Sequence, residues 1–137
     1  MGYRRFLAGL VALGGCAHAY TSPTMVKTST APDAVFDCVK RQLGVLGYKQ
    51  TSIDTDALRV NATKVDLDTR RSDTQFRRIL QKLAVEVAPG ADGQTSVEVV
   101  PHTFGEYTTQ RGPTEVEEKP MEAVTNDAQS LLEACKS

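Results

Sequence analysis

Residues 83–99 read LAVEVAPGADGQTSVEV. Apolar and polar residues alternate on both sides of the run Pro89-Gly90-Ala91-Asp92-Gly93, which consists mostly of turn-forming residues. Alternation with a period of two is typical of a strand that buries one of its faces. We therefore predict a long antiparallel hairpin in which a strand from about Arg77 to Ala88 pairs with one from Gln94 to Phe104.

The residues before this hairpin allow a second interpretation. Ser72 and Gln75 have the spacing of a capping box that could begin a short helix. One face of that helix would carry Phe76, Ile79, Leu80 and Leu83. No Gly or Pro separates residues 72–83 from the alternating segment that follows. We favour the long hairpin and keep the short helix as the alternative.

Shorter segments complete the predicted sheet. Residues 48–53 and 58–65 suit two strands joined by the polar turn at 54–57, because Leu58, Val60 and Ala62 alternate with polar residues. Residues 105–119 contain turn formers and no period, which indicates an exposed loop.

Two segments have a helical period. Residues 31–47 carry an apolar stripe that includes Val35, Cys38, Val39, Leu43 and Leu46, and Gly47 suits a left-handed stop that folds Tyr48 back on Leu43. The second helix begins near Pro120, with Val124, Ala128, Leu131, Leu132 and Cys135 on one face. The predicted fold is α+β and two-layered: a four-stranded antiparallel meander with N- and C-terminal helices on one face, in the order αββββα.

The overall composition is that of one globular domain. The chain has 137 residues, of which 40% are hydrophobic and 24% charged, and its net charge is −1. A chain without excess positive charge is poorly suited to nucleic acid, so we expect no nucleic-acid partner.

The first residues have the organisation of an export signal. Arg4 and Arg5 precede the apolar run Phe6–Leu13, which is too short to cross a bilayer because a spanning helix needs about 20 residues. The run ends in Leu13-Gly14-Gly15-Cys16, which resembles the lipobox of bacterial lipoproteins. A plain secretory signal, or a buried N-terminal strand, is the alternative.

The resemblance to bacterial lipoproteins implies cleavage before Cys16 and a lipid on its sulfur. It divides the chain into a signal peptide (1–15), a lipidated Cys with a flexible tether (16–30) and one α+β domain (31–137). The protein would then be held at the membrane of the bacterial cell envelope. Ala17 follows the Cys where Asp would resemble an inner-membrane retention signal, which favours the outer membrane, facing the periplasm, in a Gram-negative cell.

Two cysteines remain after Cys16 is assigned to lipid. Cys38 and Cys135 form an even pair in an oxidising compartment, and each lies on the apolar stripe of its helix. Antiparallel helices would place them level, so we predict a disulfide between them. Two separately buried thiols are the alternative.

The sequence contains no recognised catalytic or metal-binding motif. His18 and His102 lack partners at metal-ligand spacing, and the pairs Asp54/Asp56 and Asp66/Asp68 have no calcium-loop pattern around them. We therefore expect no cofactor, no metal and no enzymatic activity.

Two charge clusters stand out. The basic cluster could contact anionic headgroups or lipid A, or it could be a solvated face that complements the acidic cluster, which we favour. The basic cluster comprises Arg70, Arg71, Arg77, Arg78 and Lys82, and the acidic one Glu115, Glu117, Glu118 and Glu122.

Three functions are compatible with the sequence. We favour a non-catalytic, lipid-anchored envelope protein of structural or partner-binding type. Its layout is similar to that of several small lipoproteins that accompany outer-membrane assembly machinery, although a shared layout does not define a function. The alternatives are a periplasmic protein that binds a lipid or amphiphile between sheet and helices, and an enzyme whose site is not visible in the sequence.

Overall fold

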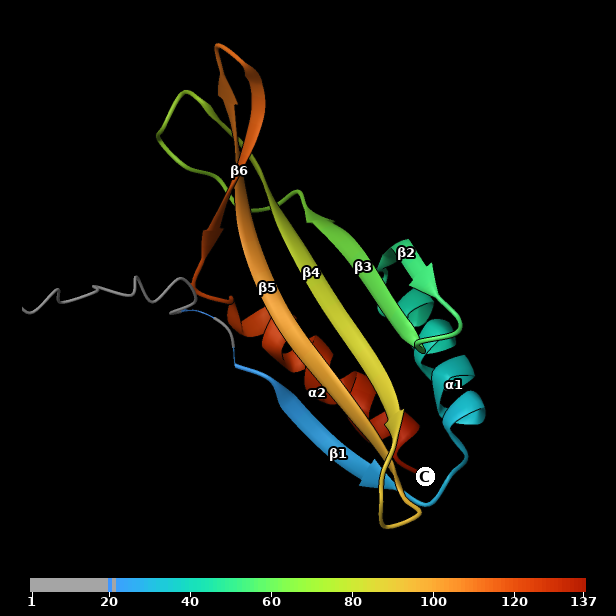
Figure 1. Ribbon diagram of the computed structural model, residues 1–137. Coiled ribbons are helices and arrows are strands. Elements are labelled where there is room, and N and C mark those ends of the chain that lie inside the picture. Colours follow the sequence, from blue (N-terminus) through green and yellow to red (C-terminus); the bar gives the residue numbers. More distant parts are fainter. Residues whose placement is uncertain (1–19, 21) are drawn as a thin grey trace, which may run out of the picture.

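The computed structural model describes residue 20 and residues 22–137, and these form two layers (Figure 1). The elements are β1 (Thr24–Thr28), α1 (Pro32–Val45), β2 (Lys49–Asp54), β3 (Arg59–Asp66), β4 (Phe76–Pro89), β5 (Thr95–Thr109), β6 (Gly112–Glu118) and α2 (Glu122–Cys135). All the strands join one antiparallel sheet in the order β1-β5-β4-β3-β2, and β6 pairs with the part of β5 that β1 leaves free. Both helices pack on the same face of the sheet (Figure 1).

The long hairpin of β4 and β5 is confirmed. Val85 pairs with Val99 and Val87 with Val97, and all four side chains are buried beneath the helices. The turn between the strands is closed by a hydrogen bond of 2.6 Å from the backbone N–H of Gly90 to the carbonyl of Gln94. Because β4 begins at Phe76, the alternative helix over residues 72–83 is wrong.

The prediction of a four-stranded sheet is wrong, because residues 22–137 alone form a sheet of six strands. One of the two additional strands is β1, which lies in the segment expected to be a tether. Its register runs from Thr24 opposite Val99 to Thr28 opposite Thr95, and Val26 packs against the core. Burial alternates along the five residues of β1, but Thr occupies the inward positions 24 and 28 and Met25 points outward, so the hydropathy shows no period of two. The folded part thus includes residues 24–30, which the expected boundary at residue 31 left outside.

The other additional strand is β6, in the segment expected to be an exposed loop. Strand β5 continues to Thr109, and the chain returns along it from Gly112, whose φ of 99° suits glycine. Most of the residues of β6 are exposed, so both of its faces meet water and its sequence shows no alternation.

The helices bury the predicted stripes. Val35, Val39 and Leu43 of α1 and Val124, Ala128, Leu131 and Leu132 of α2 are at most 2% exposed. Helix α1 ends as expected, with Gly47 at a φ of 87° and a 2.9 Å hydrogen bond from the N–H of Tyr48 to the carbonyl of Leu43.

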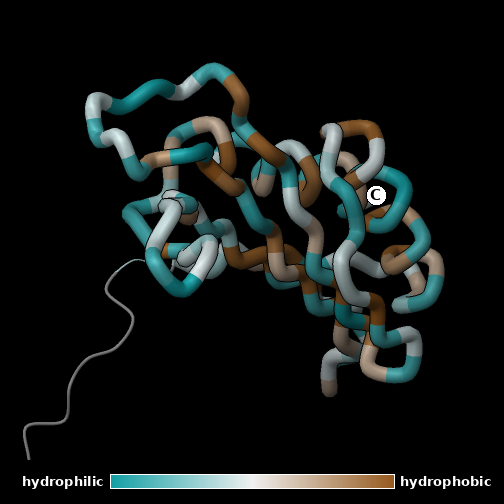
Figure 2. The backbone as a smooth tube through the Cα atoms, turned by 90° about the horizontal axis from the view of Figure 1, so that it is seen from above, coloured by the Kyte–Doolittle hydropathy of each residue, from teal (hydrophilic) through white to brown (hydrophobic). Residues whose placement is uncertain are grey.

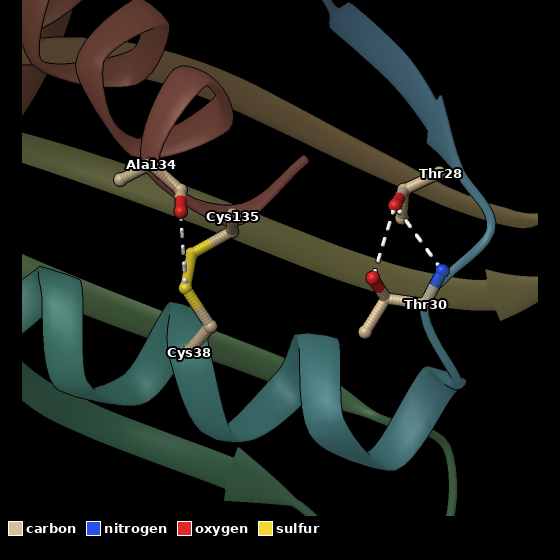
Figure 3. Close-up of a disulfide and its surroundings, with 5 residues drawn as sticks. All are labelled: Thr28, Thr30, Cys38, Ala134 and Cys135. Atoms are coloured by element: carbon tan, nitrogen blue, oxygen red, sulfur yellow. Dashed lines mark hydrogen bonds between the residues drawn. A yellow bond between two sulfur atoms is a disulfide. The ribbon is translucent and has the colours of Figure 1, made fainter. Parts of the chain in front are cut away.

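A disulfide connects the two helices (Figure 3). The sulfurs of Cys38 and Cys135 are 2.09 Å apart and their Cα atoms 5.7 Å apart, so the predicted pair is confirmed. Cys38 Sγ also lies 3.6 Å from the carbonyl oxygen of Ala134. A disulfide sulfur carries no proton, so this approach is a contact and adds no hydrogen bond.

Candidate functional site: a groove on the open face of the sheet

The sheet has one face covered by helices and one open face. Along β4, Leu83, Val85 and Val87 point toward the helices, and Lys82, Ala84 and Glu86 point to the other side. Figure 2 shows the corresponding alternation of hydrophobic and hydrophilic residues along the strands. The open face is where side chains of neighbouring strands can meet a ligand.

A groove of about 770 Å³ lies on the open face. Its floor is apolar and includes Val65, Leu80, Ala84 and Phe104, and Leu80 is buried although it points away from the helices. Small polar side chains of β2 and β3 line one wall, and charged side chains of β4, β5 and β6 line the other. The first wall comprises Thr51, Ser52, Asn61 and Thr63, and the second Arg78, Lys82, His102, Glu106, Glu115 and Glu117.

The charges of the second wall are paired across the apolar floor. Nζ of Lys82 lies 2.7 Å from Oε2 of Glu115 and 4.5 Å from the centre of the Phe104 ring. Nδ1 of His102 lies 2.8 Å from Oε1 of Glu117. The wall thus places one ion pair and one contact between an imidazole and a carboxylate beside the Phe104 ring, so it offers polar groups next to an apolar surface.

Glu106 is the most enclosed carboxylate of the groove. Its side chain is 10% exposed, and Oε1 lies 3.1 Å from Nε of Arg78 and 3.8 Å from Nε of Arg77. A carboxylate with little access to water loses hydration free energy, and nearby positive charges compensate for that loss. The two guanidinium groups therefore both engage the Glu106 carboxylate.

The first wall is shaped by an irregularity in β2. The register with β3 shifts between Gln50 and Ser52, which makes room for Thr51. The hydroxyl of Thr51 donates to the carbonyl of Asn61 at 3.2 Å, and the amide of Asn61 donates to the hydroxyl of Ser52 at 2.8 Å. The first wall thus presents hydroxyl groups from β2 and an amide group from the neighbouring strand β3, and hydrogen bonds between the two strands hold them in place.

The predicted basic cluster is distributed over several ion pairs. Arg71 donates to the Glu118 carboxylate from both terminal nitrogens of its guanidinium, Nη1 and Nη2. These hydrogen bonds raise the pKa of the guanidinium above its usual value. Arg77 and Arg78 contact Glu106, Lys82 contacts Glu115, and Arg70 donates to backbone carbonyls of its own loop. Of these five side chains, Arg71 and Lys82 contact members of the acidic cluster, Glu118 and Glu115. Arg77 and Arg78 instead contact Glu106, which lies outside that cluster.

The paired aspartates belong to turns. Asp54 Oδ1 accepts hydrogen bonds from the N–H groups of Asp56 and Ala57, and Asp66 Oδ1 accepts from those of Asp68 and Thr69. Within the described residues, no group of three or more His, Cys, Asp or Glu could hold a metal ion. Among the helices described, none is long and apolar enough to cross a membrane.

Other predicted positions fall elsewhere. The lipidation site Cys16 and His18 lie outside the described residues. The space between sheet and helices, where an amphiphile was considered, is filled by side chains such as Val97, Val99 and Leu131 that are fully buried. The groove itself was missed, since it combines residues of five strands whose register the sequence does not show.

The described residues therefore define a two-layer α+β domain with an open, grooved sheet face. In comparisons with known proteins, no family model and no curated protein sequence matches this chain.

Proposed function

We propose that this chain is a non-catalytic, lipid-anchored protein of the bacterial envelope that docks a segment of another envelope protein in its open-face groove. The lipobox at Leu13–Cys16 supports the anchor and the compartment. The groove carries the docking proposal, because an apolar floor flanked by fixed polar groups suits a peptide segment with one or two apolar side chains.

The ion pairs of the groove favour binding over catalysis. Glu106, Glu115 and Glu117 each contact a basic side chain, so each carboxylate is already engaged. Such pairs can orient a bound partner and select between partners. Because they lie at the rim of an apolar centre, they stay partly hydrated and lose little hydration free energy when a partner binds.

The anchor is tested first. The full chain is produced in a Gram-negative host, and the protein is purified from membranes for intact mass measurement. We expect a chain that begins at Cys16 and exceeds its peptide mass by the acyl groups, and a Cys16→Ala variant that no longer fractionates with membranes. An unmodified Cys16 would contradict the anchor.

Docking is tested by photo-crosslinking in the native host. A photoreactive amino acid at Thr63, which lines the groove, should capture one discrete envelope protein. The same group at Val45, which is 73% exposed on α1, should not capture it. Adding Ala84→Arg, which fills the groove from its floor, should abolish the Thr63 product, whereas Val45→Arg should preserve it. A product that survives Ala84→Arg would contradict docking in the groove.

The apolar floor also supports a second function, the binding of an amphiphile on the open face of the sheet instead of between sheet and helices. Val65, Leu80 and Phe104 would then contact an acyl chain. Native mass spectrometry of the membrane-purified protein distinguishes the two functions. If the wild-type protein carries a bound lipid and the Ala84→Arg variant does not, amphiphile binding is the favoured function.

A further inference from the structure

Strand β1 shortens the connection between the lipid and the folded domain. The sequence alone suggested a tether of 14 residues, whereas β1 begins at Thr24 and leaves only residues 17–23 between it and Cys16. Eight Cα steps separate Cys16 from Thr24, and a fully extended chain covers at most about 29 Å over that number of steps.

Strand β1 begins in the middle of one edge of the sheet. Thr24 pairs with Val99 and Glu118 pairs with Thr103, so β1 and β6 together cover β5 and leave a break between them. Beside this break is a hollow of about 410 Å³, lined by Tyr20, Ser22, Thr24, Pro101, Lys119, Pro120 and Thr125. We call β1, β6 and the break between them the anchored edge.

The geometry points to one orientation: we infer that the anchored edge faces the bilayer surface. The opposite edge, β2, lies four strand spacings away, about 19 Å across the sheet. Bringing β2 to the membrane would require the short connection to pass around the whole sheet, which takes up most of its extended length. This inference rests on the lipid anchor of the proposed function.

Several side chains of the anchored edge suit a membrane surface, and the carboxylates that β6 also carries each contact a basic side chain: Glu115 contacts Lys82, Glu117 contacts His102 and Glu118 contacts Arg71. Met25 and Val116 are 54% and 50% exposed, and Tyr20 is exposed beside Lys119. Aromatic and basic side chains with apolar bodies favour the headgroup region of a bilayer. With this edge toward the membrane, the groove opens sideways, so a partner that reaches it lies along the same membrane surface.

The orientation can be measured because the chain contains no Trp. Met25→Trp on β1 and Ile53→Trp on β2 place single fluorophores on opposite edges, and the native side chains are matched at 54% and 51% exposure. Each full chain is expressed with its signal, purified from membranes and checked for acylation by mass. It is then reconstituted in vesicles of phosphatidylethanolamine and phosphatidylglycerol that contain dansyl-labelled phosphatidylethanolamine.

Energy transfer from tryptophan to the dansyl headgroup should be several-fold stronger for Met25→Trp than for Ile53→Trp. Val116→Trp, on the same edge as Met25, should match Met25→Trp and replaces it if that variant does not fold. Equal transfer from the two edges of an acylated protein, or stronger transfer from Ile53→Trp, would overturn the orientation alone. Protein without acyl groups would overturn the proposed anchor as well.

Discussion

The phenol of Tyr48 donates a hydrogen bond of 2.9 Å to Oδ2 of Asp127, which joins the residue after the turn of α1 to the middle of α2. Nζ of Lys64, on β3, lies 3.3 Å from the same oxygen and 5.3 Å from the centre of the Tyr48 ring. One carboxylate thus connects both helices to the sheet at a position where Tyr48 is buried.

Removing the phenol oxygen should weaken this connection. Tyr48→Phe keeps the ring in the core but deletes a hydrogen bond to a charged acceptor, so we expect the free energy of unfolding to fall by about 1–2 kcal/mol. Urea denaturation checks the value. Tyr20→Phe, at an exposed position, is the matched control and should leave the midpoint unchanged.

Alkaline pH should affect the same contact. Burial raises the pKa of Tyr48 well above its ordinary value of about 10, and the hydrogen bond to Asp127 and its charge raise it further. The pKa of Tyr48 is higher in the folded state than in the unfolded state. Its contribution to stability is therefore complete below pH 10, where the phenol is protonated in both the folded and the unfolded protein. Above about pH 10 the unfolded phenol ionises first, so stability should fall as pH rises. The slope of stability against pH in this range should be smaller for Tyr48→Phe, and an equal slope would contradict the assignment.

Two glycines near the end of α1 should respond in opposite directions to alanine. Gly44 is helical and a Cβ there meets nothing within 4 Å, so Gly44→Ala should stabilise the protein by about 0.5–1 kcal/mol. Gly47 has a φ of 87°, so Gly47→Ala should destabilise it by about 1–2 kcal/mol, although the added Cβ would meet only Lys64 at 3.7 Å. Thermal unfolding measures the change in stability of both variants. If alanine stabilised the protein at both positions, or destabilised it at both, the predicted role of the turn at Gly47 would be contradicted.

The disulfide should be a major source of stability. Its partners are 97 positions apart, and closing so long a loop restricts the unfolded chain strongly. Cys38→Ala/Cys135→Ala should lower the free energy of unfolding by about 2–4 kcal/mol, as should reduction of the native protein. Thiol titration of the unreduced, acylated protein in denaturant should find no free thiol, and two free thiols would show that the bond does not form.

Protection from proteolysis should begin at β1. The backbone from Thr24 to Thr28 is paired with β5, and the hydroxyl of Thr95 donates to the carbonyl of Thr30 at 2.6 Å. Mild protease should therefore cut before Thr24 and spare residues 24–30. Val26→Ala, which removes the core contact of β1, should expose this segment to cleavage, whereas Met25→Ala should not.

Local and periodic signals predicted the centre of the fold. The alternation on both sides of the Pro89–Gly93 turn indicated β4 and β5, and the stripes of the two helices indicated which side chains enter the core. Gly47 and Tyr48 marked the end of α1. Gly47 takes the left-handed conformation, and the next residue, Tyr48, folds back on Leu43, so the whole signal lies within a few consecutive residues. The positions of Cys38 and Cys135 on those stripes were enough to predict their bond.

The edges and the open face of the sheet depended on tertiary structure. Strand β6 has water on both faces, and β1 places Thr24 and Thr28 inward and Met25 outward, so neither shows a hydropathy period. Their backbone pairing with β5 is what makes them strands. The same pairing determines which carboxylate meets Lys82 or Arg71. The sequence by itself therefore determined the helices, the central hairpin and the disulfide, since each depends on neighbours along the chain or on one apolar stripe. Only the tertiary structure decided the sheet's edges, the groove and the side from which the chain leaves, because these depend on the register between strands far apart in sequence.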